Sequence, residues 1–184
     1  IVISSPTNFS NLVLCPILGE FLTKHPGIHI KVILDDSRGL PERGEYDLAI
    51  RAGVFENNSV IVRPFSSIRF VTCAAPVYFE KYGIPHEPAD LKQHNCIDYS
   101  YRHGGPVWHY TKNEKLISTP ANGNLVANNA HFVKMVALAG AGIVHLPQFM
   151  VHEEIKKKQL LTCLDEYTSQ TIPISIIYPF SSKL

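Results

Sequence analysis

Apolar residues along this chain alternate between short β-branched runs and a longer stretch with helical spacing. Residues 1–6 (IVISSP) form a short run, and 7–25 follow with apolar residues on one helical face. Two more β-branched runs occupy 28–36 and 46–52. A short turn or helix is expected between them at 38–44, and the order of strand, helix, strand, short helix and strand predicts a parallel α/β sheet.

The predicted helix over 7–25 has an apolar stripe and one interruption. Leu14, Leu18, Phe21 and Leu22 fall at helical spacing. Pro16 lies inside the helix and lacks a backbone N–H, so we expect a kink or a locally loosened turn there.

The second half of the chain repeats the α/β pattern. A helix is expected from Asn128 or Asn129 to 142, and another over 148–159. The apolar stripe of the first of these is predicted to be Phe132, Met135, Val136 and Ala139. Short apolar runs predict strands at 57–65, 67–76, 96–101, 107–111, 114–119, 123–128, 143–147, 160–164 and 172–179.

Two α/β stretches therefore flank a central strand at 69–76. The last strand, 172–179, is placed so that it could return the chain to the first stretch. The pattern predicts two lobes that are joined by two crossovers, with a cleft between them.

Composition and charge exclude several classes of protein. The 184 residues are 45% hydrophobic with a net charge of +1, so no strong field attracts nucleic acid or an acidic membrane. No run is long and apolar enough to span a bilayer. Four scattered cysteines without a CxxC pair, and no signal peptide before Ile1, lead us to expect a piece of a longer cytoplasmic protein.

Two strand ends carry polar residues where a helix is expected to begin. Ligands in open α/β sheets bind beyond the carboxyl ends of strands, and helix starts favour anions. Thr7, Asn8 and Ser10 follow the first strand, and Asn128 and Asn129 precede the second-half helix. They suit a small carboxylate or a similar anion, or they only cap the two helices.

The strand over 46–52 carries a buried-looking arginine at its end. Arg51 could hold a ligand carboxylate in two hydrogen bonds, and Gly53 would let the backbone turn close by. The alternative is a structural ion pair between Arg51 and Asp35 or Asp36.

Other reactive side chains do not form a recognisable catalytic site. Tyr99 and Tyr101 follow a predicted strand and suit either a ligand cleft or a core. Cys73, at the crossover, is a candidate redox sensor or a buried inert thiol. The histidines and cysteine between 86 and 109 fit no zinc spacing, and no nucleophile motif or dinucleotide fingerprint is present. We therefore predict no enzyme activity, no metal and no cofactor.

Several segments, in order along nearly the whole chain, resemble a known family. They are SSPTNFSNLVLCPILGEFLTKHPGIHI, YDLAIRAG, SVIVRPF, TCAAPVYFEKYGIPHEPADLKQHNCI, ANNAHFVKMVALAGAGIVHLPQFMV and IPISIIYP. The chain is thereby similar to the effector-binding domain of LysR-type bacterial transcriptional regulators.

The resemblance implies a fold like that of type II periplasmic solute-binding proteins. Lobe I would comprise 1–73 and 175–184, and lobe II would comprise 74–174. A winged helix-turn-helix upstream of Ile1, absent from this chain, would make the only contact with promoter DNA.

The resemblance also implies an effector site and an oligomer. A small, anionic effector would bind between the lobes and change their arrangement. The candidate contacts are Thr7, Asn8, Phe9, Ser10, Arg51, Tyr99, Tyr101, Asn128 and Asn129. Copies would pair side by side as a homodimer or homotetramer, with Leu18 and Phe21 of the first helix at the interface or in the core.

Two other functions share parts of this pattern. A solute-binding protein of a transport system has the same fold and also binds without chemistry. A small α/β enzyme would need a nucleophile or an acid–base pair in the cleft. A helix-turn-helix encoded upstream would eliminate the first alternative, and turnover of a bound ligand would revive the second.

Overall fold

The chain divides into two units, which are described separately. The computed structural model describes residues 1–37, 39–40, 44–55, 59–100, 106–169 and 171–180. Unit 1 comprises Ile1–Ile68 and Ile172–Leu184, and unit 2 comprises Arg69–Thr171. The division falls a few residues before the expected 73/74 and 174/175 boundaries, because strands β4 (Val60–Ile68) and β13 (Ile172–Pro179) pair with each other as far as Ile68 and Ile172.

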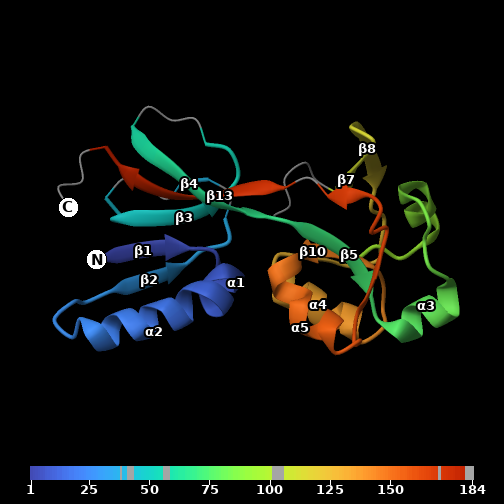
Figure 1. Cartoon of the computed structure of the whole chain (residues 1–184), viewed down its shortest axis with the longest axis horizontal. Helices are drawn as coiled ribbons and strands as arrows, with labels where there is room; N and C mark the ends of the chain where they lie inside the picture. Colours follow the sequence, from blue (N-terminus) through green and yellow to red (C-terminus); the bar gives the residue numbers. More distant parts are fainter. Residues whose placement is uncertain (38, 41–43, 56–58, 101–105, 170, 181–184) are drawn as a thin grey trace. The chain divides into compact units, whose positions relative to one another are not determined.

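Unit 1 is built on a five-stranded sheet in the order β2–β1–β3–β13–β4 (Figure 1). Its strands are β1 (Val2–Ser5), β2 (Lys31–Leu34), β3 (Leu48–Ala52), β4 (Val60–Ile68) and β13 (Ile172–Pro179). The first three are parallel, and β13 runs antiparallel to both β3 and β4. The parallel strands place their carboxyl ends at one edge, where the sequence predicts ligand contacts.

One continuous helical segment follows β1. It consists of α1 (Thr7–Phe9), a π-helical turn (Ser10–Leu14) and α2 (Cys15–Lys24). The wide turn ends two residues before Pro16, which agrees with the expected loosening, because Pro16 cannot donate the normal helical hydrogen bond.

Unit 2 contains a central three-stranded antiparallel sheet in the order β10–β5–β11, a second sheet in the order β12–β7–β8, and a parallel β6–β9 pair. Its strands are β5 (Phe70–Ala74), β6 (Asp98–Tyr99), β7 (Val107–Lys112), β8 (Lys115–Pro120), β9 (Val126–Ala127), β10 (Val144–Pro147), β11 (Leu161–Cys163) and β12 (Thr168–Ser169). Its helices are α3 (Pro76–Tyr82), a 3₁₀ helix (Pro88–Gln93), α4 (Ala130–Leu138) and α5 (Gln148–Lys156).

Helix α4 buries a different face from the one that the sequence predicted. Ala130, Val133 and Ala137 are buried, whereas Phe132 and Met135 are each about half exposed. The predicted stripe was therefore wrong for Phe132, Met135 and Ala139, which are exposed, whereas Val136 is half-buried and packs against the core. Small side chains pack against the core here, and the larger apolar side chains turn to the surface. No helix within the described residues is long and apolar enough to cross a membrane.

Candidate functional site

The carboxyl ends of the parallel strands in unit 1 bring together groups that are far apart in sequence. Ser5 ends β1, and its carbonyl accepts a hydrogen bond from the backbone N–H of Asp35 at 3.0 Å. Asp35 follows β2, and Arg51 lies near the end of β3. The edge thus gathers serine hydroxyls, carboxylates and a guanidinium.

Arg51 is buried, and its guanidinium is bound to the protein. It donates to Asp35 Oδ2 at 2.8 Å and to Ser4 Oγ at 2.8 Å. It also donates to the carbonyl oxygens of Gly39 at 3.0 Å and Ile50 at 2.9 Å. This is the structural ion pair that the sequence left open as an alternative, and the role of Arg51 in effector binding stays a prediction.

Burial and charge act in opposite directions on this ion pair. Burial lowers the pKa of the Arg51 guanidinium, and the nearby Asp35 carboxylate opposes that effect. Burial alone would raise the pKa of Asp35, but hydrogen bonds from Ser37 and the charge of Arg51 hold it below its ordinary value. Asp35 is therefore ionised at neutral pH and neutralises Arg51.

The start of the helical segment contains one satisfied donor and two unsatisfied hydroxyls. The backbone N–H of Thr7 donates to Asp36 Oδ1 at 2.8 Å, so a carboxylate already occupies this helix start. The side-chain oxygens of Ser5 and Ser10 are buried and have no hydrogen-bond partner among the described residues. Thr7 and Ser10 are predicted site residues, whereas Ser5 and Asp36 were not predicted to contact a ligand.

The other predicted residues of this segment are less enclosed. Asn8 and Phe9 are half-buried. The ring of Phe9 meets that of Phe65 edge-on, with the centroids 6.4 Å apart.

The other predicted residues lie in unit 2, at the start of α4 and in the neighbouring strands β6 and β9. Asn129 caps α4, and its Oδ1 accepts from the backbone N–H of Phe132 at 2.9 Å. Tyr99 pairs with Ala127 in the β6–β9 ladder, so it lies close in the fold to the exposed Asn128. Tyr101 falls outside the described residues.

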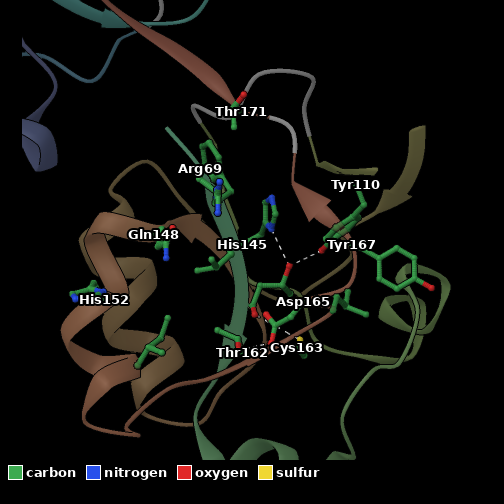
Figure 2. A pocket seen from close by; sticks show the side chains of 15 residues that line it. Arg69, Tyr110, His145, Gln148, His152, Thr162, Cys163, Asp165, Tyr167 and Thr171 are labelled. Carbon is green, nitrogen blue, oxygen red and sulfur yellow. Dashed lines mark hydrogen bonds between the residues drawn. The ribbon is translucent and has the colours of Figure 1, made fainter. Parts of the chain in front are cut away.

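A pocket of about 570 Å³ lies in unit 2, beside the start of β5 (Figure 2). Its wall includes the buried His145, whose Nδ1 lies 2.9 Å from Thr72 Oγ1. The same hydroxyl lies 2.8 Å from the hydroxyl of Tyr110. The rings of Phe70 and Trp108 both stack on His145, with centroids 5.4 Å away in each case.

Comparison with known proteins identifies the chain. The family model for the LysR substrate binding domain matches residues 1–184. The chain belongs to this family. It is 33% identical over 180 residues to an uncharacterised HTH-type transcriptional regulator of Haemophilus influenzae. The aligned region covers 97% of this chain and 62% of that regulator. The chain is 28% identical to the HTH-type transcriptional activator AaeR of Escherichia coli, covering 94% of the chain and 56% of that protein. The chain thus spans about three-fifths of these regulators.

Solved structures support the same fold for this LysR substrate-binding domain. The regulatory domain of AphB from Vibrio vulnificus is 23% identical and covers 100% of the chain and 92% of that chain, with a TM-score of 0.87. CrgA, a LysR-type transcriptional regulator from Neisseria meningitidis, is 26% identical and covers 98% of the chain and 61% of its own, with a TM-score of 0.85. The predicted family and its periplasmic-binding-protein-like α/β fold are confirmed.

The remaining predicted residues of this LysR domain lie in less distinctive surroundings. Leu18 and Phe21 are half-buried, and the most exposed large apolar residue of α2 is Ile17. Cys73 is fully buried, and burial raises the pKa of its thiol to about 12. Since the reactive form is the thiolate, this surrounding favours the inert alternative. No metal-binding group of histidine, cysteine or carboxylate side chains was found in the described part of the chain.

Sequence reasoning missed three features of this domain. Ser5 was interpreted only as the last residue of a strand. Its position was a usable signal, because ligands bind beyond the carboxyl ends of parallel strands. Asp36 was considered only as a partner of Arg51, whereas it caps Thr7. His145 was interpreted as packing or surface, and nothing in the linear sequence shows that it hydrogen-bonds Thr72, whose hydroxyl also reaches Tyr110.

Proposed function

We propose that this chain is the sensing part of a LysR-type transcription factor and binds a small anionic effector. Its place in the LysR substrate-binding family supports the sensing role. DNA binding would belong to a further part of the protein, as in the longer HTH-type relatives. The factor would act in the bacterial cytoplasm and bind its effector without turnover.

The observation that carries the effector site is the pair of unsatisfied hydroxyls at the end of β1. Ser5 and Ser10 are at most 5% exposed, and neither side chain has a hydrogen-bond partner in the described residues. A buried hydroxyl without a partner costs about 1–3 kcal/mol. A ligand with acceptor oxygens would accept hydrogen bonds from the two hydroxyls and remove that cost. A purely structural role for the two serines would leave the cost in place.

The start of the helical segment favours a negatively charged ligand. The Thr7 N–H holds the Asp36 carboxylate at 2.8 Å, so a ligand carboxylate could take the same position after Asp36 moves aside. Asp36 then acts as a competing anion in the free protein. We expect Asp36→Asn to increase the affinity for an anionic effector several-fold, because the variant removes a like charge from the site.

Effector binding would act by population shift. A ligand that binds one arrangement of the two units more tightly than another changes their equilibrium in proportion to that difference in affinity. In an oligomer, the change would pass to the DNA-binding parts and alter their position on the promoter.

The first experiment is thermal unfolding of this chain with small carboxylates, aromatic acids, amino acids and inorganic anions. A ligand at about 100 times its Kd should stabilise the fold by roughly 2.7 kcal/mol. Ser10→Ala and Asn128→Ala should each reduce the shift. Ser66→Ala, at an exposed position of β4, is the control and should not.

Each result decides between functions. Loss of the shift in Ser10→Ala with unchanged ligand recovered afterwards would support a sensor. No shift with any anion would remove the anionic effector, and chemical conversion of the ligand would favour an enzyme. A transport protein is not favoured, because the relatives reported above are transcriptional regulators.

A further inference from the structure

The pocket of unit 2 has its own architecture, independent of the effector site proposed above. Every described residue that lines it lies between Arg69 and Thr171, within one unit. Strand β11 pairs with β5 only as far as Cys163 and Thr72, so the pocket opens along β5 beyond that point. We propose that this pocket is a second ligand site, which binds a small aromatic carboxylate.

The inner wall of the pocket is suited to a flat ring. Phe70 and His145 stack at 16°, and Tyr110 meets the ring of Tyr167 edge-on at 80°. The hydroxyl of Thr72 lies within hydrogen-bond distance of both Tyr110 and His145. Because these polar groups bind one another, an apolar ring can pack here without leaving a buried donor or acceptor of this network unsatisfied.

The outer wall of the pocket offers donors that are not engaged. Arg69, Gln148 and His152 are exposed, and their side chains form no hydrogen bond or ion pair within the described ranges. A guanidinium binds a carboxylate through two parallel hydrogen bonds. Among the described residues that line the pocket, the one carboxylate is Asp165, which already accepts from Thr162 Oγ1 at 2.8 Å. The unengaged groups therefore match a ligand with acceptor oxygens better than one with an ammonium group.

The pocket also lies at both connections between the units. Arg69 is the first residue of unit 2 and Thr171 is the last, and both line the pocket (Figure 2). A ligand in the pocket would contact both chain segments that continue into unit 1. Its binding thus provides a second input to the sensing domain.

Isothermal titration calorimetry with benzoate tests this site. We expect Arg69→Gln to weaken benzoate binding about tenfold or more, since it removes a charged hydrogen-bond donor. Benzamide, a neutral analogue, should bind the variant and the original chain equally. The matched control is Arg63→Gln, which changes an exposed arginine of unit 1 whose guanidinium carbon lies 5.8 Å from the ring centroid of Tyr178.

The result also separates the two proposed sites. Retained affinity in Arg69→Gln, or no benzoate binding at millimolar concentration, would overturn the second site. Loss of benzoate binding in Ser10→Ala, with Arg69→Gln unaffected, would place benzoate in the effector site instead. Loss of benzoate binding in Arg69→Gln, but not in Ser10→Ala, supports the second site. This holds whatever the thermal-unfolding experiment with small anions shows. Because Arg69 is exposed, equal melting temperatures should show that its variant folds.

Discussion

Adjacent serines at the end of β1 have opposite roles at the scale of single residues. Ser4 accepts a hydrogen bond from Arg51 and belongs to the ion-pair network of unit 1. Ser5 is equally buried but has no hydrogen-bond partner within the described chain. The same residue type therefore stabilises the fold at one position and leaves a polar group unsatisfied at the next.

This contrast predicts different costs for the same substitution. Ser4→Ala should lower the free energy of unfolding by about 1–2 kcal/mol, because an Arg51 N–H loses its acceptor. Ser5→Ala should be neutral or slightly stabilising, because it removes a buried hydroxyl that is not hydrogen-bonded. Urea unfolding of both variants measures the difference. A larger loss in Ser5→Ala than in Ser4→Ala would contradict this account.

The Asp35–Arg51 pair predicts a pH dependence. The pKa of Asp35 is lower in the folded chain than its ordinary value of 3.8. Ionised Asp35 thus contributes stability that is complete above about pH 5 and is lost as pH falls through the folded pKa. The stability advantage of the original chain over Asp35→Asn should be constant near neutrality and shrink below about pH 4. Denaturation midpoints measured from pH 3 to 7 check this, and an advantage independent of pH would refute it.

At the scale of secondary-structure elements, a buried ion pair ties α4 to α5. Lys134 Nζ lies 2.6 Å from Glu154 Oε1 and also donates to the carbonyl of Met150 at 3.1 Å. The two charged side chains are only 9% and 18% exposed. Removal of one charge leaves the other poorly solvated, which is costly.

Neighbouring glutamates of α5 supply a matched comparison. Glu154→Ala should destabilise the chain by about 2–4 kcal/mol, because Lys134 stays buried without its partner. Glu153→Ala should change stability by about 0.5 kcal/mol or less, because Glu153 is 62% exposed and lies 3.9 Å from Lys157. Thermal unfolding should rank the variants in this order. The double variant Lys134→Met with Glu154→Ala should recover part of the loss, and equal effects of the two single variants would refute the argument.

At the scale of the whole molecule, each unit presents an exposed apolar face on a helix. Leu12 and Ile17 are at least half exposed near the start of unit 1, as is Leu34 at the end of β2. In unit 2, Phe132 and Met135 of α4 are also half exposed. Large apolar residues gathered on a surface often mark an interface, and we propose that a second copy of this chain covers both faces.

If a second copy covers these faces, a charged residue introduced on either face should weaken the dimer. Ile17→Asp and Phe132→Asp should each raise the dimer dissociation constant at least about tenfold, because each buries a charge against apolar side chains. Leu116→Asp, on β8, is the control: Leu116 is 61% exposed and lies on neither helix. Sedimentation equilibrium distinguishes these results. The same dissociation constant in all three variants would exclude this interface.

The order of elements was largely predictable, because β-branched runs and helical spacing are local properties. The last strand, 172–179, coincides with β13, and the first helix ends within one residue of its predicted end. The burial of α4 was not predictable in this way. Its size pattern favoured Phe132 and Met135, but the packing selected the smaller Ala130 and Ala137.

The sequence alone determined the family, from the order of its segments along the chain. It also determined the succession of strands and helices and the polar strand ends, since these depend on residues that are close together in the chain. Only the tertiary structure decided which polar groups are satisfied. Arg51 finds Asp35 and Ser4, Thr7 finds Asp36, and Ser5 and Ser10 find no partner within the described residues. Those outcomes depend on contacts between segments that are distant in sequence, and a hydrogen bond forms only when the fold brings donor and acceptor within about 3 Å of each other.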